Sequence, residues 1–128
     1  MKIEHVALNV TQPLEMSRWY VEHLGFTVKR RYMEAPWGHF LADSSDKVML
    51  ELYGNTDVPR LDLPNVAPPA LHFAFTSSNV DADVKRLQAA GATLVSGPES
   101  ASNGDRLAML RDPWGVCIQL VSRSQPMV

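Results

Sequence analysis

Apolar and polar residues alternate in two short stretches that open the two halves of the chain. In residues 3–10 one face is apolar, and the other carries His5 beside a small and a polar neighbour. In residues 71–76 one face is again apolar, and the other carries His72, which follows His5 by 67 positions. A period of two predicts a strand in each stretch. Each half therefore begins with a strand that carries a histidine opposite its apolar face.

The rest of the pattern repeats in the same order. Apolar positions at helical spacing follow each first strand, and Gly25 and Gly91 end the two predicted helices. Further strands are predicted at 26–33, 39–43, 47–53, 93–96, 107–111 and 116–121. The order is βαβββ in each half, which indicates an internal duplication. We predict an α+β fold in which two tandem βαβββ modules form a curved mixed sheet around a cavity, with the helices outside.

Length and turn-forming residues set the expected domain organisation. A chain of 128 residues fits a single domain, here 1–128. Prolines and glycine gather between the halves, which predicts module one at 1–54, a linker at 55–70 and module two at 71–123.

The last predicted strand of each half also carries one polar donor opposite its apolar face, Glu51 in the first half and Gln119 in the second. Glu51 follows His5 by 46 positions, and Gln119 follows His72 by 47. Because the spacing is nearly equal, a pseudo-twofold axis between the halves would bring all four side chains to one point. This predicts a metal site. The alternative is a solvated face whose polar residues bind nothing, although small and apolar neighbours such as Ala7 and Cys117 fit a half-enclosed cavity better.

Composition and charge exclude several classes of partner. Hydrophobic residues make up 45% of the chain, charged residues 20%, and the net charge is −2, which gives no basis for binding nucleic acid or an acidic membrane. No segment is apolar over a bilayer's width, and the charged start, Met1-Lys2-Ile3-Glu4-His5, does not match a secretory signal. The single Cys117 excludes an intramolecular disulfide and a cysteine-based zinc site. We expect a cytoplasmic protein.

Four segments together resemble the vicinal oxygen chelate superfamily, which includes glyoxalase I, fosfomycin-resistance proteins, extradiol dioxygenases and bleomycin-resistance proteins. They are Ile3-Glu4-His5-Val6-Ala7, Trp19-Tyr20 through Leu24-Gly25-Phe26, Leu71-His72-Phe73-Ala74-Phe75, and Asp112-Pro113-Trp114-Gly115. The resemblance extends over residues 3–123. It implies the same duplicated fold, and often a homodimer.

The resemblance also implies a metal site where the first and last strands of each module converge. In glyoxalase I all four strands supply a ligand, which corresponds here to His5, Glu51, His72 and Gln119. Gln119 departs from the pattern, because metal-using members generally carry a glutamate there. Glutamine ligates through its carbonyl oxygen but is a weaker, neutral ligand and cannot act as a base. Imidazole and carboxylate ligands suit Zn, Ni, Fe, Co or Mn and do not distinguish among them.

Three further residues are candidate substrate contacts. Tyr53 follows Glu51 by two positions, so the two side chains share a face of the predicted strand. Tyr53 therefore either lines the cavity or ends its strand at the surface. Trp37 and His39 lie where a substrate lid or a dimer contact could form, and the alternative is a turn held by packing of the tryptophan.

Two functions follow from these expectations. The first is a glyoxalase-like metalloenzyme, a lyase or isomerase that chelates a small oxygenated substrate and stabilises an anionic intermediate, with Glu51 taking the proton-transfer role. The alternative is a metal-free protein of the bleomycin-resistance type that binds a small molecule.

Overall fold

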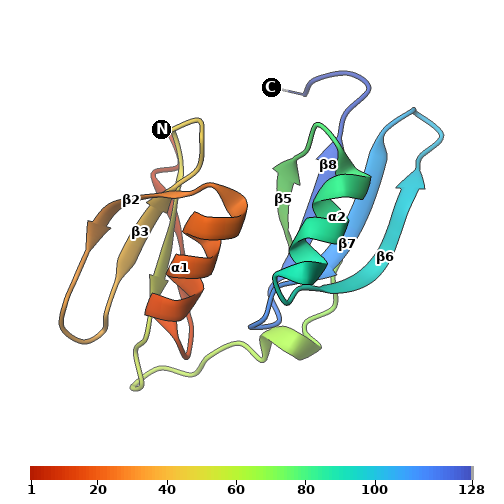
Figure 1. Ribbon diagram of the computed structural model, residues 1–128. Coiled ribbons are helices and arrows are strands. Elements are labelled where there is room, and N and C mark those ends of the chain that lie inside the picture. The colour runs from red at the N-terminus through yellow and green to blue at the C-terminus, as the bar shows by residue number, and fades with distance from the viewer. Residues whose placement is uncertain (128) are drawn as a thin grey trace. The chain divides into compact units, whose positions relative to one another are not determined.

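The computed structural model describes residues 1–127 and consists of two units, Met1–Leu61 and Asp62–Val128. In each unit a single α-helix lies against one face of a four-stranded mixed sheet (Figure 1). The first unit contains β1 (His5–Asn9), α1 (Pro13–Leu24), β2 (Thr27–Arg31), β3 (His39–Ala42) and β4 (Met49–Tyr53). The second contains the 3₁₀ helix η1 (Leu63–Asn65), β5 (Phe73–Thr76), α2 (Val80–Ala89), β6 (Thr93–Ser100), β7 (Arg106–Arg111) and β8 (Cys117–Ser122). The predicted α+β class and the two βαβββ modules are confirmed.

The two sheets have the same topology. The strand order is β1-β4-β3-β2 in the first and β5-β8-β7-β6 in the second, with the first and last strand of each unit paired in parallel. Ala7 pairs with Glu51 in one sheet and Ala74 with Gln119 in the other. Each histidine precedes that alanine by two residues, so the duplication extends to the register of the strands.

Helix α1 forms where the sequence provides both of its ends. Pro13 is in the first turn, where its missing N–H costs no helical hydrogen bond. Gly25 caps the other end at φ 73°, and its N–H donates to the Tyr20 carbonyl. The face that points to the sheet carries Met16 and Tyr20, which are fully buried.

Helix α2 begins at a capping side chain. The Asn79 side-chain oxygen accepts a hydrogen bond from the Ala82 N–H at 3.0 Å, which satisfies one of the amides left unpaired at a helix start. Val80 and Leu87 then bury themselves against the sheet. Burial of a large aliphatic side chain contributes about 1.5–3 kcal/mol to the stability of the fold, and each unit buries its own group of apolar side chains. The largest fully buried side chains are Val10, Met16, Tyr20, Leu41 and Leu52 in the first unit and Val80, Leu87, Leu110, Val116 and Ile118 in the second.

Tight contacts attach the segment around η1 to the second unit. The Arg111 guanidinium donates to the carbonyl oxygens of Leu63 at 3.1 Å and Val66 at 2.8 Å. Gly115, at φ 91°, lies so close to Pro64 that a Cβ there would be 2.6 Å from the Pro64 nitrogen. Glycine is therefore required at this position both by the positive φ and by the close approach of Pro64.

Three details differ from the expected strands. Val6 is 43% exposed, although Leu8 and Val10 on the same face are buried, because β1 is an edge strand and α1 packs on β3 and β4. Strand β5 begins at Phe73, so His72 lies just before it. Strand β6 continues to Ser100 through register shifts around Gly97, which a sequence pattern reads as a break. No helix within residues 1–127 is long and apolar enough to cross a lipid bilayer.

Asp105 holds the chain end of the second unit. Its carboxylate is buried and accepts hydrogen bonds from the Ser124 N–H at 2.8 Å and the Arg123 guanidinium at 2.7 Å. These bonds, the backbone bond first, lower the pKa of Asp105 to about 2.

The lowered pKa predicts an acid-dependent contribution to stability. A carboxyl group whose pKa is lower in the folded state stabilises the fold above its unfolded pKa of about 4, and loses that contribution as the pH falls toward 2. Asp105→Asn should therefore be less stable than the wild type at pH 7, and the two free energies of unfolding should converge between pH 4 and 2. Urea denaturation over this range measures the difference. A gap that stays constant with pH would contradict the assignment.

Candidate metal centre

His5 and Glu51 come together on the face of the first sheet that α1 does not cover. The Nε2 atom of His5 lies 3.5 Å from Oε2 of Glu51. The parallel register places them, because His5 pairs with Met49 and Ala7 with Glu51. The two side chains are 37% and 22% exposed, so both are partly shielded and still reachable from solvent.

Glu4 fixes the orientation and tautomer of the His5 ring. The Nδ1–H of His5 donates to the Glu4 carboxylate, and Nε2 therefore faces Glu51. The bond to Glu4 is the main reason that the pKa of His5 is raised above its usual 6.5, and the Glu51 charge raises it further. A carboxylate bonded to the distal nitrogen of a histidine is the arrangement that commonly supports a metal-binding imidazole.

The pair is suited to a cation. In the neutral Nδ1–H tautomer, the lone pair of Nε2 faces a carboxylate oxygen, and two electron-rich atoms remain close only if a proton or a metal ion lies between them. Two ligand atoms about 2.1 Å from a tetrahedral Zn²⁺ would lie about 3.4 Å apart. The observed 3.5 Å agrees with that spacing. The spacing is thus compatible with a shared proton, as in a His–Glu ion pair, and with a divalent ion.

Aromatic rings surround the carboxylate. Phe40 pairs with Glu51 across the sheet, and its ring meets the His5 ring edge-on at 5.4 Å. Tyr32 lies beside Phe40, with ring centroids 6.4 Å apart. Gly38 lies against these groups, because a Cβ at that position would be 3.2 Å from Cδ2 of Tyr32 and 3.7 Å from Oε1 of Glu51. The result is a partly apolar setting around one carboxylate and one imidazole.

The second unit repeats the arrangement with a different anchor. The Nδ1–H of His72 donates to the Pro68 carbonyl oxygen at 2.8 Å, which again assigns the lone pair to Nε2. Gln119 is half-buried and pairs with Ala74 on one side and Met109 on the other. Cys117, two residues before it, is buried, and burial raises the pKa of its thiol, so it is a packing residue and not a nucleophile.

Either unit by itself provides only part of a ligand set. Within the described residues of each unit, no three His, Cys, Asp or Glu side chains are arranged to hold a metal ion. The four-ligand site predicted from the sequence stays a prediction.

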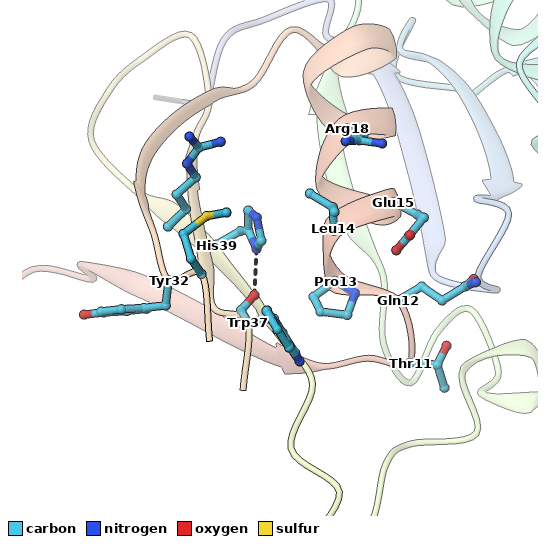
Figure 2. Close-up of a pocket in the computed structure, with 11 residues that line it drawn as sticks. Thr11, Gln12, Pro13, Leu14, Glu15, Arg18, Tyr32, Trp37 and His39 are labelled. Atoms are coloured by element: carbon cyan, nitrogen blue, oxygen red, sulfur yellow. Dashed lines mark hydrogen bonds between the residues drawn. The ribbon is translucent and has the colours of Figure 1, made fainter. Parts of the chain in front are cut away.

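The predicted substrate residues occupy two different faces of the first sheet. Tyr53 is half-buried and shares strand parity with Glu51. His39 pairs with Leu52, so it lies on the face covered by α1, opposite Glu51. There His39 and Trp37 line a pocket beside the start of α1 (Figure 2). Their role as substrate contacts stays a prediction.

A family model establishes where this chain belongs. The model of the Glyoxalase/Bleomycin resistance protein/Dioxygenase superfamily matches residues 2–120. The chain belongs to this superfamily. A search of curated proteins gave no match. The predicted resemblance is thus confirmed at the level of the family, whose members include metalloenzymes such as glyoxalase I.

Solved structures agree on the fold. TnmS3, an antibiotic-binding protein from Streptomyces sp. CB03234, is 24% identical with a TM-score of 0.70 over 94% of this chain and 93% of that one. A glyoxalase family protein from Bacillus cereus is 21% identical with a TM-score of 0.74 over 94% and 91%. A mutant of glyoxalase I from Zea mays is 21% identical with a TM-score of 0.74 over 97% of this chain and 46% of that one. At these identities the likeness concerns the fold and not the activity.

Sequence reasoning missed the residues that orient the two histidines. Glu4 is adjacent to His5 and could have been considered as its partner, since a carboxylate next to an imidazole is a common pairing. Pro68 contributes only a backbone carbonyl, and no residue type signals that. Phe40 required the register between β3 and β4.

The geometry predicts how His5 titrates. In the metal-free protein its pKa should lie above 6.5, because Glu4 and Glu51 both favour the imidazolium. Glu4→Gln should lower the pKa of His5 more than Glu51→Gln does. Nitrogen-15 NMR of the imidazole rings against pH measures both shifts. Glu22→Gln, beside His23, is the matched control and should leave His5 unchanged; a His5 pKa unmoved by Glu4→Gln would refute the assignment.

Proposed function

We propose that this protein is a glyoxalase-like metalloenzyme that binds a divalent ion through His5, Glu51, His72 and Gln119. The observation that carries the proposal is the His5–Glu51 pair, with two electron-rich atoms 3.5 Å apart and the imidazole held by Glu4. Membership of a superfamily that contains glyoxalases and dioxygenases supports it.

The equivalent contact in the second unit adds support. His72, like His5, has its Nδ1 occupied by an acceptor, so Nε2 is the nitrogen available as a ligand. The same register relation links His72 to Gln119 as links His5 to Glu51. Two units with one imidazole and one oxygen ligand each give a set that suits Zn, Ni, Fe, Co or Mn.

The residues have separate roles in this proposal. A bound divalent ion supplies Lewis acidity toward the vicinal oxygens of a small substrate, which is the basis for lyase or isomerase chemistry. Glu51 holds or removes a proton at its carboxylate, since Gln119 cannot act as a base. Tyr53, on the parity of Glu51, positions the substrate.

The remaining expectations complete the proposal. The partner is a small-molecule substrate, and neither nucleic acid nor a membrane is involved. The chain acts as a homodimer in the cytoplasm, in keeping with many proteins of this type.

A metal-free binding function is the second candidate. The neutral Gln119 and the antibiotic-binding protein among the structural neighbours favour it. In this alternative the chain sequesters a small molecule, as bleomycin-resistance proteins do, and a proton on His5 takes the place of the ion beside Glu51.

Metal content separates the two candidates. Protein purified without a chelating resin should contain stoichiometric divalent metal by elemental analysis, and His5→Ala and His72→Ala should each lose it. His23→Gln, outside the proposed ligand set, is the control and should retain it. Metal-free wild-type protein that also fails to take up Zn²⁺, Ni²⁺, Co²⁺, Mn²⁺ or Fe²⁺ on dialysis would reject the enzyme proposal and support the binding protein.

Gln119 provides a gain-of-function test. Gln119→Glu adds a second carboxylate to the ligand set, and a charge-assisted ligand worth about 1.4 kcal/mol corresponds to about tenfold tighter binding. Competition titration with a chromophoric chelator measures the affinity for Zn²⁺. Gln88→Glu, on the exposed surface of α2, adds the same charge as a control and should leave the affinity unchanged. Equal affinity of Gln119→Glu and the wild type would exclude Gln119 from the site.

A further inference from the structure

The first unit contains a pocket on the face of the sheet opposite Glu51. It lies between the first turns of α1 and the hairpin that joins β2 to β3, and its volume is about 540 Å³ (Figure 2). Its lining includes Leu14, Glu15, Arg18, Arg31, Met33, Trp37 and His39. His39 and Glu51 point to opposite faces of the sheet, so the pocket and the His5–Glu51 pair lie on different faces, and Tyr32, just after β2, borders both.

His39 supplies a buried polar atom to this pocket. The residue is only 5% exposed, and its Nδ1–H donates to the Trp37 carbonyl oxygen at 2.6 Å. The bond sets the neutral tautomer, so Nε2 is a hydrogen-bond acceptor. Within residues 1–127 the ring of His39 makes no other side-chain hydrogen bond, so Nε2 has no partner there. Every fully buried side-chain nitrogen or oxygen in this range does have a partner, so Nε2 is not fully buried. It is therefore open to the pocket that the ring lines. A ligand with an O–H or N–H group would satisfy it.

The charges around the pocket favour an anion. Arg18 and Arg31 contribute two guanidinium groups against the single carboxylate of Glu15. Neither arginine forms an ion pair or a side-chain hydrogen bond with any described residue. Arginine presents a planar set of N–H donors that matches a carboxylate.

The apolar part of the pocket favours a flat ring. Trp37 is 48% exposed, and Leu14 and Met33 are exposed beside it at 41% and 69%. A ligand that covers these exposed apolar side chains removes apolar surface from water, which favours binding, and the indole of Trp37 offers a flat face on which a ring can stack. Trp37 has φ 60°, a conformation that is rare for a bulky residue, and the bond from His39 to its carbonyl holds the segment in place.

We infer that this pocket is a second ligand site, distinct from the metal centre, for a small aromatic carboxylate that also carries a hydroxyl or N–H donor. The carboxylate lies toward Arg18 and Arg31, the ring lies on Trp37, and the donor bonds to Nε2 of His39. The inference does not depend on whether a metal binds at His5 and Glu51.

The test uses 6-hydroxy-2-naphthoate, which has a flat ring with a carboxylate at one end and a hydroxyl at the other. The full chain is titrated in buffer with EDTA, so that no metal can bind the carboxylate, and amide NMR shifts are followed. We expect saturable shifts concentrated in residues 11–18 and 31–39. The related 2-naphthol, without the carboxylate, should bind about tenfold more weakly, and 2-naphthoate, without the hydroxyl, several-fold more weakly.

Variants assign the binding to the named groups. Arg18→Gln/Arg31→Gln should raise the dissociation constant of 6-hydroxy-2-naphthoate about tenfold, since exposed ion pairs are individually modest. Arg30→Gln/Arg60→Gln removes the same charge from exposed arginines outside the pocket and should leave the constant unchanged. His39→Leu should bind 6-hydroxy-2-naphthoate and 2-naphthoate equally.

Three outcomes would overturn the inference. They are the absence of saturable shifts up to millimolar probe, shifts that centre on residues outside the pocket, and equal weakening by the two double-arginine variants. Because all four arginines are exposed, their replacement should leave the fold intact, and the amide spectrum of each variant verifies this.

Discussion

The parallel pairing of the first and last strand in each unit is the constraint on which the rest of the molecule depends. Parallel strands need a long connection between them, and here α1 with β2 and β3, or α2 with β6 and β7, provides it. The register then decides which side chains share a face. Ala7 opposite Glu51 brings His5 to the carboxylate, and Ala74 opposite Gln119 establishes the same relation for His72. A slip of one residue would move every donor to the helix side.

Each histidine is held at Nδ1 by a group that can only accept a hydrogen bond, a carboxylate from Glu4 and a carbonyl from Pro68. The anchors differ in charge. Glu4 raises the proton affinity of His5, while Pro68 contributes a dipole and no net charge to His72. Because protons and metal ions compete for an imidazole nitrogen, the raised pKa of His5 would make binding of the proposed ion there depend on pH.

The sequence was sufficient for the fold because local signals and the duplication agreed. Gly25 after α1 and Asn79 before α2 have specific hydrogen-bonding roles that the residue types announce. Strand β6 was predicted too short, since Gly97 and Pro98 signal a turn and only pairing with β7 keeps the strand together. His39 is predicted as a substrate contact together with Tyr53 and Trp37, and its position two residues before Leu41 could have indicated that it lies on the opposite face from Glu51. The pocket beside α1 could not be predicted, because it depends on how the helix packs on the β2–β3 hairpin.

Gln119 bears on both proposed functions, because its side chain has an amide nitrogen where a glutamate would have a second carboxylate oxygen. In the proposed site a glutamate at this position would add a second carboxylate to that of Glu51, and two anions in a shielded setting are costly without a cation. An amide at this position avoids that cost, so the proposed site would not need an ion for the fold to remain stable. His5 and Glu51 can compensate each other through a proton when no metal is present, as the raised pKa of His5 reflects. In this proposal, a nitrogen in place of one carboxylate oxygen lowers the requirement for a metal and still leaves a carbonyl oxygen as a ligand, which is compatible with both candidate functions.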